Sequence, residues 1–164
     1  MPRPNRERES APLRTGKALV LLALSVAAIA LPAPSRAQQT FEPGAFEIGG
    51  RPFHCPDVRT RLFLFLPQLA SWTPGFINLD EPRFREEPAE VQGFIYAHEC
   101  AHEMFGRNEF VADCEGVKLA RRLGFVREES LPLICARFET TLGSSFVPAS
   151  IRCSHIRMCF RQER

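Results

Sequence analysis

The chain has 164 residues, enough for about one domain; 45% of them are hydrophobic and 24% are charged. This balance is typical of a folded globular protein and excludes a disordered tail. The net charge of +2 comes from the first 37 residues, because the rest of the chain carries more acidic than basic side chains. The body therefore lacks the basic patch of a nucleic-acid-binding protein, and we expect no nucleic-acid partner.

Residues 1–37 predict a secretory signal peptide. Residues 1–17 are polar and cationic, and residues 18–31 form an apolar run in which Ser25 is the one polar residue. Ser35 and Ala37 then provide the small residues of a cleavage site. The apolar run is shorter than the ~20 residues that span a bilayer. We therefore expect cleavage after Ala37 and export to the bacterial periplasm or the medium, with a retained membrane anchor as the alternative.

Residues 38–164 are then a soluble single domain with no stable membrane span. All of the chain's cysteines lie in this part, and an even number in an exported chain predicts three disulfides. The sequence leaves their pairing open. No C-x-x-C motif occurs, so neither a zinc ribbon nor a thioredoxin-type site is expected. The cysteines are Cys55, Cys100, Cys114, Cys135, Cys153 and Cys159.

The first part of this domain has β character. Residues 38–44 are expected to be a flexible lead-in, and from residue 45 to 80 short Phe-rich runs are interrupted by glycine and proline. The runs that predict strands are Arg51–Cys55, Arg61–Leu66 and Gly75–Leu79.

After Pro88 the apolar spacing becomes helical, and glycines and an asparagine punctuate it. Gly106 is placed to end one helix and Asn108 to cap the next. The pattern predicts helices over residues 89–105, 109–123, about 130–142 and 150–161. The expected fold class is α+β, a small N-terminal sheet followed by three or four helices.

The first of these predicted helices carries the H-E-x-x-H motif, as Tyr-Ala-His-Glu-Cys-Ala-His over residues 96–102. His98 and His102 are four residues apart, so both imidazoles project from one face of a helix and can bind one metal ion. Glu99 can reach a water on that ion. Zinc makes this water acidic, and the carboxylate takes its proton and passes it to the leaving amine. The motif predicts a catalytic Zn²⁺ site with Glu99 as general base.

A catalytic zinc site uses three protein ligands and one open position. Glu109 lies in the first turn of the next helix, which a short antiparallel connection would bring back towards the ion. Asp113 lies one turn further on the same face. We expect Glu109 to be the third ligand and Asp113 to bind a ligand histidine, with the reverse assignment as the alternative.

The H-E-x-x-H motif, followed by Glu-Phe-Val-Ala-Asp over residues 109–113, resembles the gluzincin metallopeptidases of the CAAX-endopeptidase and heat-shock membrane-protease type. The chain is more similar to small exported bacterial proteins with H-E-C-x-H and E-x-x-A-D-C motifs, in which Cys100 and Cys114 match the cysteines. This resemblance is specific over residues 96–118, weaker over 135–160 and absent before 75. It implies a zincin-like fold, zinc bound by the two histidines and Glu109, and a structural role for Asp113.

Other residues of these families have no clear counterpart here. The transmembrane helices of the membrane proteases are missing. Tyr96, Arg152 and His155 are candidates to polarise a substrate carbonyl, although each is more typical of a packing or surface residue. His54 is expected to be a loop residue. Residues 76–79 form either the edge strand that binds an extended peptide or an ordinary sheet strand.

The sequence as a whole predicts an exported, disulfide-stabilised zinc metalloendopeptidase whose partner is a peptide or protein substrate. One alternative is a non-catalytic exported protein that keeps the zinc-binding helix pair as a structural or binding element. A short chain leaves little room for the second wall of a substrate cleft, which favours this alternative. Glu99 argues against it, because a structural zinc site has no use for that carboxylate.

Overall fold

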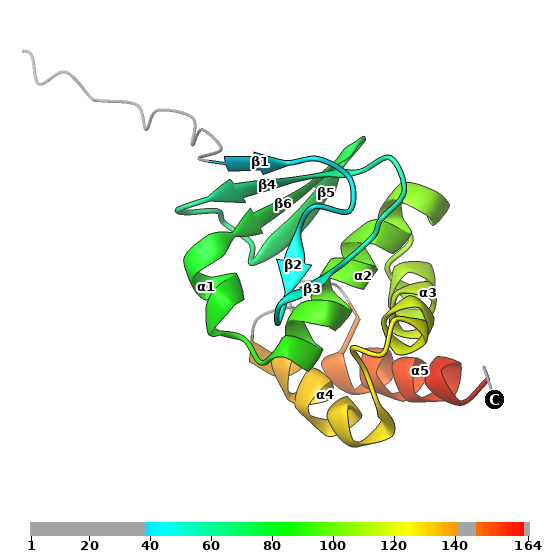
Figure 1. Ribbon diagram of the computed structural model, residues 1–164. Helices are drawn as coiled ribbons and strands as arrows, with labels where there is room; N and C mark the ends of the chain where they lie inside the picture. The colour runs from blue at the N-terminus through cyan, green and yellow to red at the C-terminus, as the bar shows by residue number, and fades with distance from the viewer. Residues whose placement is uncertain (1–38, 141–146, 163–164) are drawn as a thin grey trace, which may run out of the picture. The chain divides into compact units, whose positions relative to one another are not determined.

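The computed structural model describes residues 39–140 and 147–162, which belong to one compact unit. Strands dominate its first half and helices its second half, so the α+β class is confirmed (Figure 1). The signal peptide and its cleavage after Ala37 lie outside the described residues. Within the described part of the chain, no helix is both long enough and apolar enough to cross a membrane.

The main sheet has four strands in the order β1-β4-β6-β5. Strands β4 and β6 are parallel, and each is antiparallel to its outer neighbour. A separate antiparallel pair is formed by β2 and β3. The strands are β1 Gln39–Phe41, β2 Glu47–Ile48, β3 Arg51–Pro52, β4 Arg59–Phe63, β5 Ala70–Thr73 and β6 Phe76–Asp80.

Several strand predictions need correction. The expected flexible lead-in contains β1, which is held by its pairing with β4. The predicted strand Arg51–Cys55 shrinks to two residues, because Cys55 leaves the pair to enter a disulfide. Of the two alternatives for residues 76–79, the structure has the ordinary strand: β6 lies between β4 and β5. The free edge on this side of the sheet belongs to β5, which the sequence did not predict.

The helices agree closely with the sequence prediction. They are α1 Glu81–Glu86, α2 Ala89–Phe105, α3 Glu109–Arg122, α4 Leu131–Thr140 and α5 Ala149–Gln162, with a 3₁₀ turn at Glu128–Ser130. The predicted end of the third helix at residue 142 lies outside the described residues. The motif helix is the second helix and not the first, because Asp80 caps the short helix α1, which the sequence analysis did not predict.

The boundary between α2 and α3 follows from three residues. Gly106 ends α2 with a positive φ of 83°, a backbone conformation that glycine adopts without strain. Asn108 then caps α3, because its side chain accepts hydrogen bonds from the backbone N–H groups of Phe110 and Val111. The connection is therefore short, and α2 and α3 pack side by side (Figure 1).

Helix α2 also packs against the sheet, through β5 and β6, and α5 packs against both α3 and α4. The buried apolar side chains of α2 belong to one hydrophobic core, together with side chains from the main sheet and from the segment between β1 and β4. The largest of them are aromatic: Phe46, Phe53, Phe84, Phe94 and Tyr96.

All six cysteines form disulfides, so the predicted three bonds are confirmed. Cys55 pairs with Cys100 and ties the loop after β3 to α2. Cys114 pairs with Cys159 and joins α3 to α5. Cys135 pairs with Cys153 and joins α4 to α5. Helix α5 is therefore bonded covalently to two neighbouring helices.

Removing the α3–α5 disulfide by the double substitution Cys114→Ser and Cys159→Ser should lower the free energy of unfolding by about 2–4 kcal/mol, because the bond restricts the unfolded chain. Urea unfolding measures this. The matched variant, Cys135→Ser with Cys153→Ser, opens a disulfide with a sequence separation of 18 in place of 45. Chain entropy predicts a loss smaller by about 0.8 kcal/mol for it. A larger loss of stability in the Cys135/Cys153 variant than in the Cys114/Cys159 variant would contradict the chain-entropy explanation.

Candidate metal centre

Helix α2 presents His98, Glu99 and His102 towards one pocket. All three side chains are largely buried between α2, α3 and strand β5. Three donor residues lie close enough together to hold one metal ion: His98, His102 and Glu109. The structure thus brings together the four residues that the sequence assigned to the site.

The three donor residues form a compact cluster, called the donor triangle below, whose donor atoms lie within 4.8 Å of one another. The Nε2 atoms of His98 and His102 are 3.1 Å apart. The two carboxylate oxygens of Glu109 face one nitrogen each: Oε2 lies 3.4 Å from His98 Nε2, and Oε1 lies 3.4 Å from His102 Nε2. In tetrahedral zinc with bond lengths of about 2.0–2.1 Å, neighbouring donor atoms lie roughly 3.3 Å apart. The nearest distances between these donor groups are therefore compatible with a bound zinc ion.

The remaining ring nitrogens face fixed acceptors. His102 Nδ1 lies 2.8 Å from the carbonyl oxygen of Gly106, and this bond assigns the ring proton to Nδ1. His98 Nδ1 lies 3.0 Å from Asp113 Oδ1, and Asp113 is fully buried. Partners on Nδ1 leave each Nε2 lone pair for a metal. Asp113 thus contacts His98 on the side of the ring away from the donor triangle.

Carboxylates and histidines at this site shift one another's pKa values. Burial acts to lower the pKa of His98, but Asp113 and Glu109 outweigh it and raise the pKa to about 9. The same balance raises the pKa of His102, where Glu109 and the Gly106 carbonyl outweigh burial. The two histidines in turn hold the pKa of Glu109 well below its usual range. A bound cation would replace these protons, so metal binding should release protons.

Glu99 is held apart from this triangle. Burial raises the pKa of its carboxyl group, and the positive charges of His98 and His102 lower it to a smaller extent. The backbone N–H of Trp72, on strand β5, donates a hydrogen bond to the carboxylate. Trp72 also stacks on the His102 ring, with centroids 6.0 Å apart. Strand β5 therefore contacts both the general-base candidate and one of the candidate ligand histidines.

Arg152 reaches the site from α5. Its guanidinium donates to both oxygens of Asp113, at 2.6 and 2.7 Å, and to Glu109 Oε2 at 3.2 Å. The pKa of Asp113 is lowered, since its bonds to His98 and Arg152 outweigh the effect of burial. The guanidinium of Arg152 thus binds the carboxylates of Asp113 and Glu109. These bonds do not favour its candidate role as a donor to a substrate carbonyl.

Close approach of α3 to α2 makes these contacts possible. Gly116 lies against the backbone of His98, so that a Cβ atom at this position would be only 2.8 Å from His98 Cα. Sequence analysis did not identify Gly116, Trp72 or this role of Arg152. Their importance depends on contacts between segments far apart in the chain.

The other candidates lie elsewhere. Tyr96 is a packing residue: its ring is buried against Phe46 and Phe53, and its hydroxyl group is 2.5 Å from the Thr60 hydroxyl group. His54 is an exposed loop residue outside the donor cluster.

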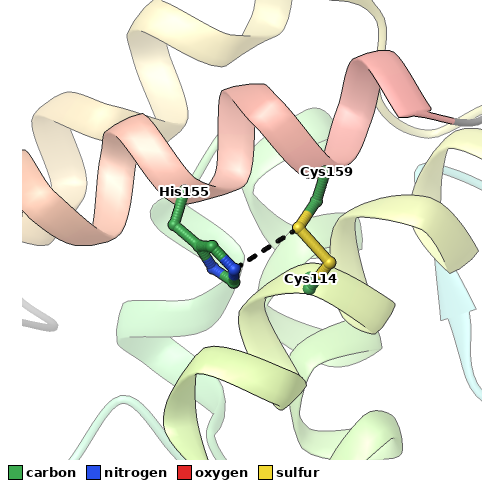
Figure 2. A group of neighbouring side chains, drawn as sticks. All are labelled: Cys114, His155 and Cys159. Carbon is green, nitrogen blue, oxygen red and sulfur yellow. Dashed lines mark hydrogen bonds between the residues drawn. A yellow bond between two sulfur atoms is a disulfide. The ribbon is translucent and has the colours of Figure 1, made fainter.

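His155 belongs to a second cluster, with Cys114 and Cys159 (Figure 2). Its Nε2 atom is 3.6 Å from the sulfur of Cys159, and its ring packs edge-on against Phe110. The two sulfurs of the cluster are joined to each other, so neither is a thiolate that can bind a metal. This cluster is a helix–helix crosslink, and His155 does not contact the candidate metal centre.

A pocket of about 640 Å³ is lined by the candidate metal-binding residues. Residues of strand β5, helix α2 and the start of α3 line this pocket together with Arg152. This volume lies within the range of small-molecule and peptide side-chain pockets. Segments on both sides of α2 in the sequence therefore contribute to this pocket.

Comparison of the chain with protein-family profiles, curated proteins and solved structures finds no match in any of the three.

Proposed function

We propose that the protein is an exported zinc-dependent metalloendopeptidase of the gluzincin type with a zincin-like fold. The observation that carries this proposal is the donor triangle of His98, His102 and Glu109 beside the buried carboxylate of Glu99, inside a pocket. The three disulfides and the H-E-x-x-H helix beside a small sheet support it.

Each residue has a defined task in this proposal. His98, His102 and Glu109 would hold the metal. The chemistry that bound zinc supplies is Lewis acidity, which makes water acidic enough to lose a proton near neutral pH. Glu99 accepts that proton and donates it to the leaving amine, and burial, which raises its pKa, suits it to both steps. Asp113 and Arg152 orient His98 and Glu109.

Strand β5 is the element that would bind an extended peptide. Among the described strands it is the outermost on its side of the main sheet, and it lines the pocket beside the residues that would hold the metal. A peptide added to such an edge gains backbone hydrogen bonds, whatever its side chains are. This placement replaces the earlier candidate at residues 76–79, which lie inside the sheet.

Metal content of the mature, oxidised chain from Gln38 to Arg164 is the first test. We expect one zinc per chain after exhaustive dialysis, measured by elemental analysis, and its loss in His98→Ala. A folded wild-type protein that takes up no zinc, even after reloading, would contradict the proposal. Zinc binding without hydrolysis of any peptide would favour the non-catalytic, zinc-binding alternative.

Ligand assignment is tested by two substitutions in α3. Glu109→Ala removes a donor of the triangle and should weaken zinc binding by at least about 10²-fold, whereas Asp113→Asn keeps the shape of a side chain that contacts His98 and should cost less. Competition with a chromophoric chelator measures both affinities. The reverse ranking would make Asp113 the ligand.

A further inference from the structure

We propose that the pocket selects peptides with an apolar side chain on one side of the scissile bond and a carboxylate on the other, and that Arg107 binds this carboxylate. The inference rests on the proposed peptidase function, and it concerns residues that neither bind the metal nor transfer protons. Three features carry it: the direction of the pocket, the chemistry of its two ends and the fixed backbone around Arg107.

The two ends of the pocket can be told apart because β5 and α2 run alongside each other. Trp72 hydrogen-bonds through its backbone to Glu99 and through its indole to Glu103, and the N–H of Gly75 also donates to Glu103. The end of β5 therefore lies beside the last turns of α2. The residues before β5 and at its start line the pocket together with the earlier turns of α2, at Phe94 and Ile95. The metal-binding residues lie between these two ends.

One end of the pocket is apolar. Its lining residues include Leu69, Ala70, Phe94 and Ile95, all of them apolar. Gln68, which lines the same end, is polar but uncharged. A buried aliphatic or aromatic side chain is stabilised by roughly 1.5–3 kcal/mol when it leaves water for such surroundings. This end therefore suits a large apolar residue of a substrate.

At the other end, Arg107 occupies the connection between α2 and α3. Its backbone is fixed on both sides, since the Gly106 carbonyl accepts from His102 Nδ1 and Asn108 caps α3. The side chain is exposed and lines the pocket. Across residues 39–140 and 147–162 it has no ion-pair or hydrogen-bond partner. Arg152, by contrast, is already bonded to Asp113 and Glu109.

Arg107 thus offers a guanidinium that has no partner among the described residues, on a backbone that is held in place relative to His102. A guanidinium binds a carboxylate through two parallel hydrogen bonds, which is a specific as well as a strong contact. The carboxylate can come from an Asp or Glu side chain or from the C-terminus of a short peptide. Both groups are carboxylates and would bind Arg107 in the same way, and peptides that carry only one of them distinguish the two sources.

Binding can be measured without turnover, because Trp72 is the single tryptophan of the chain and lines the pocket. Fluorescence titrations of zinc-loaded Glu99→Gln protein would compare acetylated, amidated alanine-based hexapeptides that contain one Leu and, nearby, either Glu or Gln. We expect the Glu peptide to bind roughly tenfold more tightly, and its advantage to vanish with Arg107→Glu. A Gln peptide with a free C-terminus tests the second source of the carboxylate.

Arg157→Glu is the matched control, because Arg157 is an exposed arginine on α5 that lines no part of this pocket. It should leave the preference for Glu unchanged. Replacing Leu by Asn in the peptide should also weaken binding about tenfold. Equal binding of the Glu and Gln peptides, or a preference that survives Arg107→Glu, would overturn the role of Arg107.

Cleavage of a mixture of natural peptides by the zinc-loaded wild-type protein, analysed by mass spectrometry, separates this inference from the function on which it rests. Cleavage sites should be enriched in an apolar residue on one side and an acidic residue on the other. Cleavage without this enrichment would refute the selectivity and leave the peptidase function standing. Absence of cleavage together with the predicted binding preference would refute the peptidase function and support the selectivity of the pocket.

Discussion

Glu99→Gln is expected to retain one zinc per chain and to hydrolyse peptides roughly 10²- to 10⁴-fold more slowly than the wild-type protein. Glutamine fills the same buried space and still offers an oxygen to the backbone N–H of Trp72. It cannot accept a proton at neutral pH. The donor triangle of His98, His102 and Glu109 does not include this side chain, so metal binding should survive.

Elemental analysis and mass spectrometry of peptide products test the two halves of this prediction in one sample. Glu90→Gln is the matched control: Glu90 lies in the first turn of the same helix, is exposed and does not line the metal pocket. It should bind zinc and hydrolyse peptides like the wild-type protein. Full activity in Glu99→Gln would remove Glu99 as the general base, and loss of zinc would make it a ligand.

The helical half of the fold could be predicted because its signals are local. Gly106, Asn108 and Gly124 end or begin helices at the positions where a positive φ or a capping side chain is needed, and the structure places the boundaries there. The boundaries of α2 were correct at both ends. Such signals depend on residues within one turn of the boundary, so no long-range contact is required to read them.

The sheet could not be predicted with the same accuracy, since its strands exist through their partners. β1 has three residues and is ordered by its pairing with β4. β5 contains Ser71 and Thr73 beside Trp72, and its composition does not distinguish an edge strand from a loop. Edge position also depends on the order β1-β4-β6-β5, which is a property of the whole chain.

The candidate site divides in the same way. His98, Glu99 and His102 could be assigned from spacing on one helix, and Glu109 from a short connection. Residues that reach the site from distant segments have no fixed spacing from this motif in the sequence, so their contacts with it could not be predicted. Trp72 comes from β5, and Arg152 comes from a helix that is bonded to α3 and α4 through disulfides whose pairing the sequence left open.

Gly116→Ala is expected to destabilise the protein and weaken zinc binding together. Two effects oppose each other here: alanine favours a helix over glycine by about 1 kcal/mol, whereas its Cβ atom would meet the His98 backbone at 2.8 and 2.9 Å. Backbone atoms cannot rotate away, so α3 must shift from α2. Overpacking of this kind costs typically about 1–3 kcal/mol, and we expect it to exceed the gain in propensity.

The shift matters for function because Glu109 and Asp113 are on the helix that must move, whereas His98 and His102 stay on α2. The donor triangle should therefore open, and zinc affinity measured by chelator competition should fall with the free energy of unfolding measured in urea. Lys118→Ala, on the same helix, removes the ion pair with Glu115 but adds no atom between α3 and α2, so zinc affinity should stay close to that of the wild-type protein. A Gly116→Ala protein that is more stable and binds zinc normally would mean that helix separation does not control the metal centre.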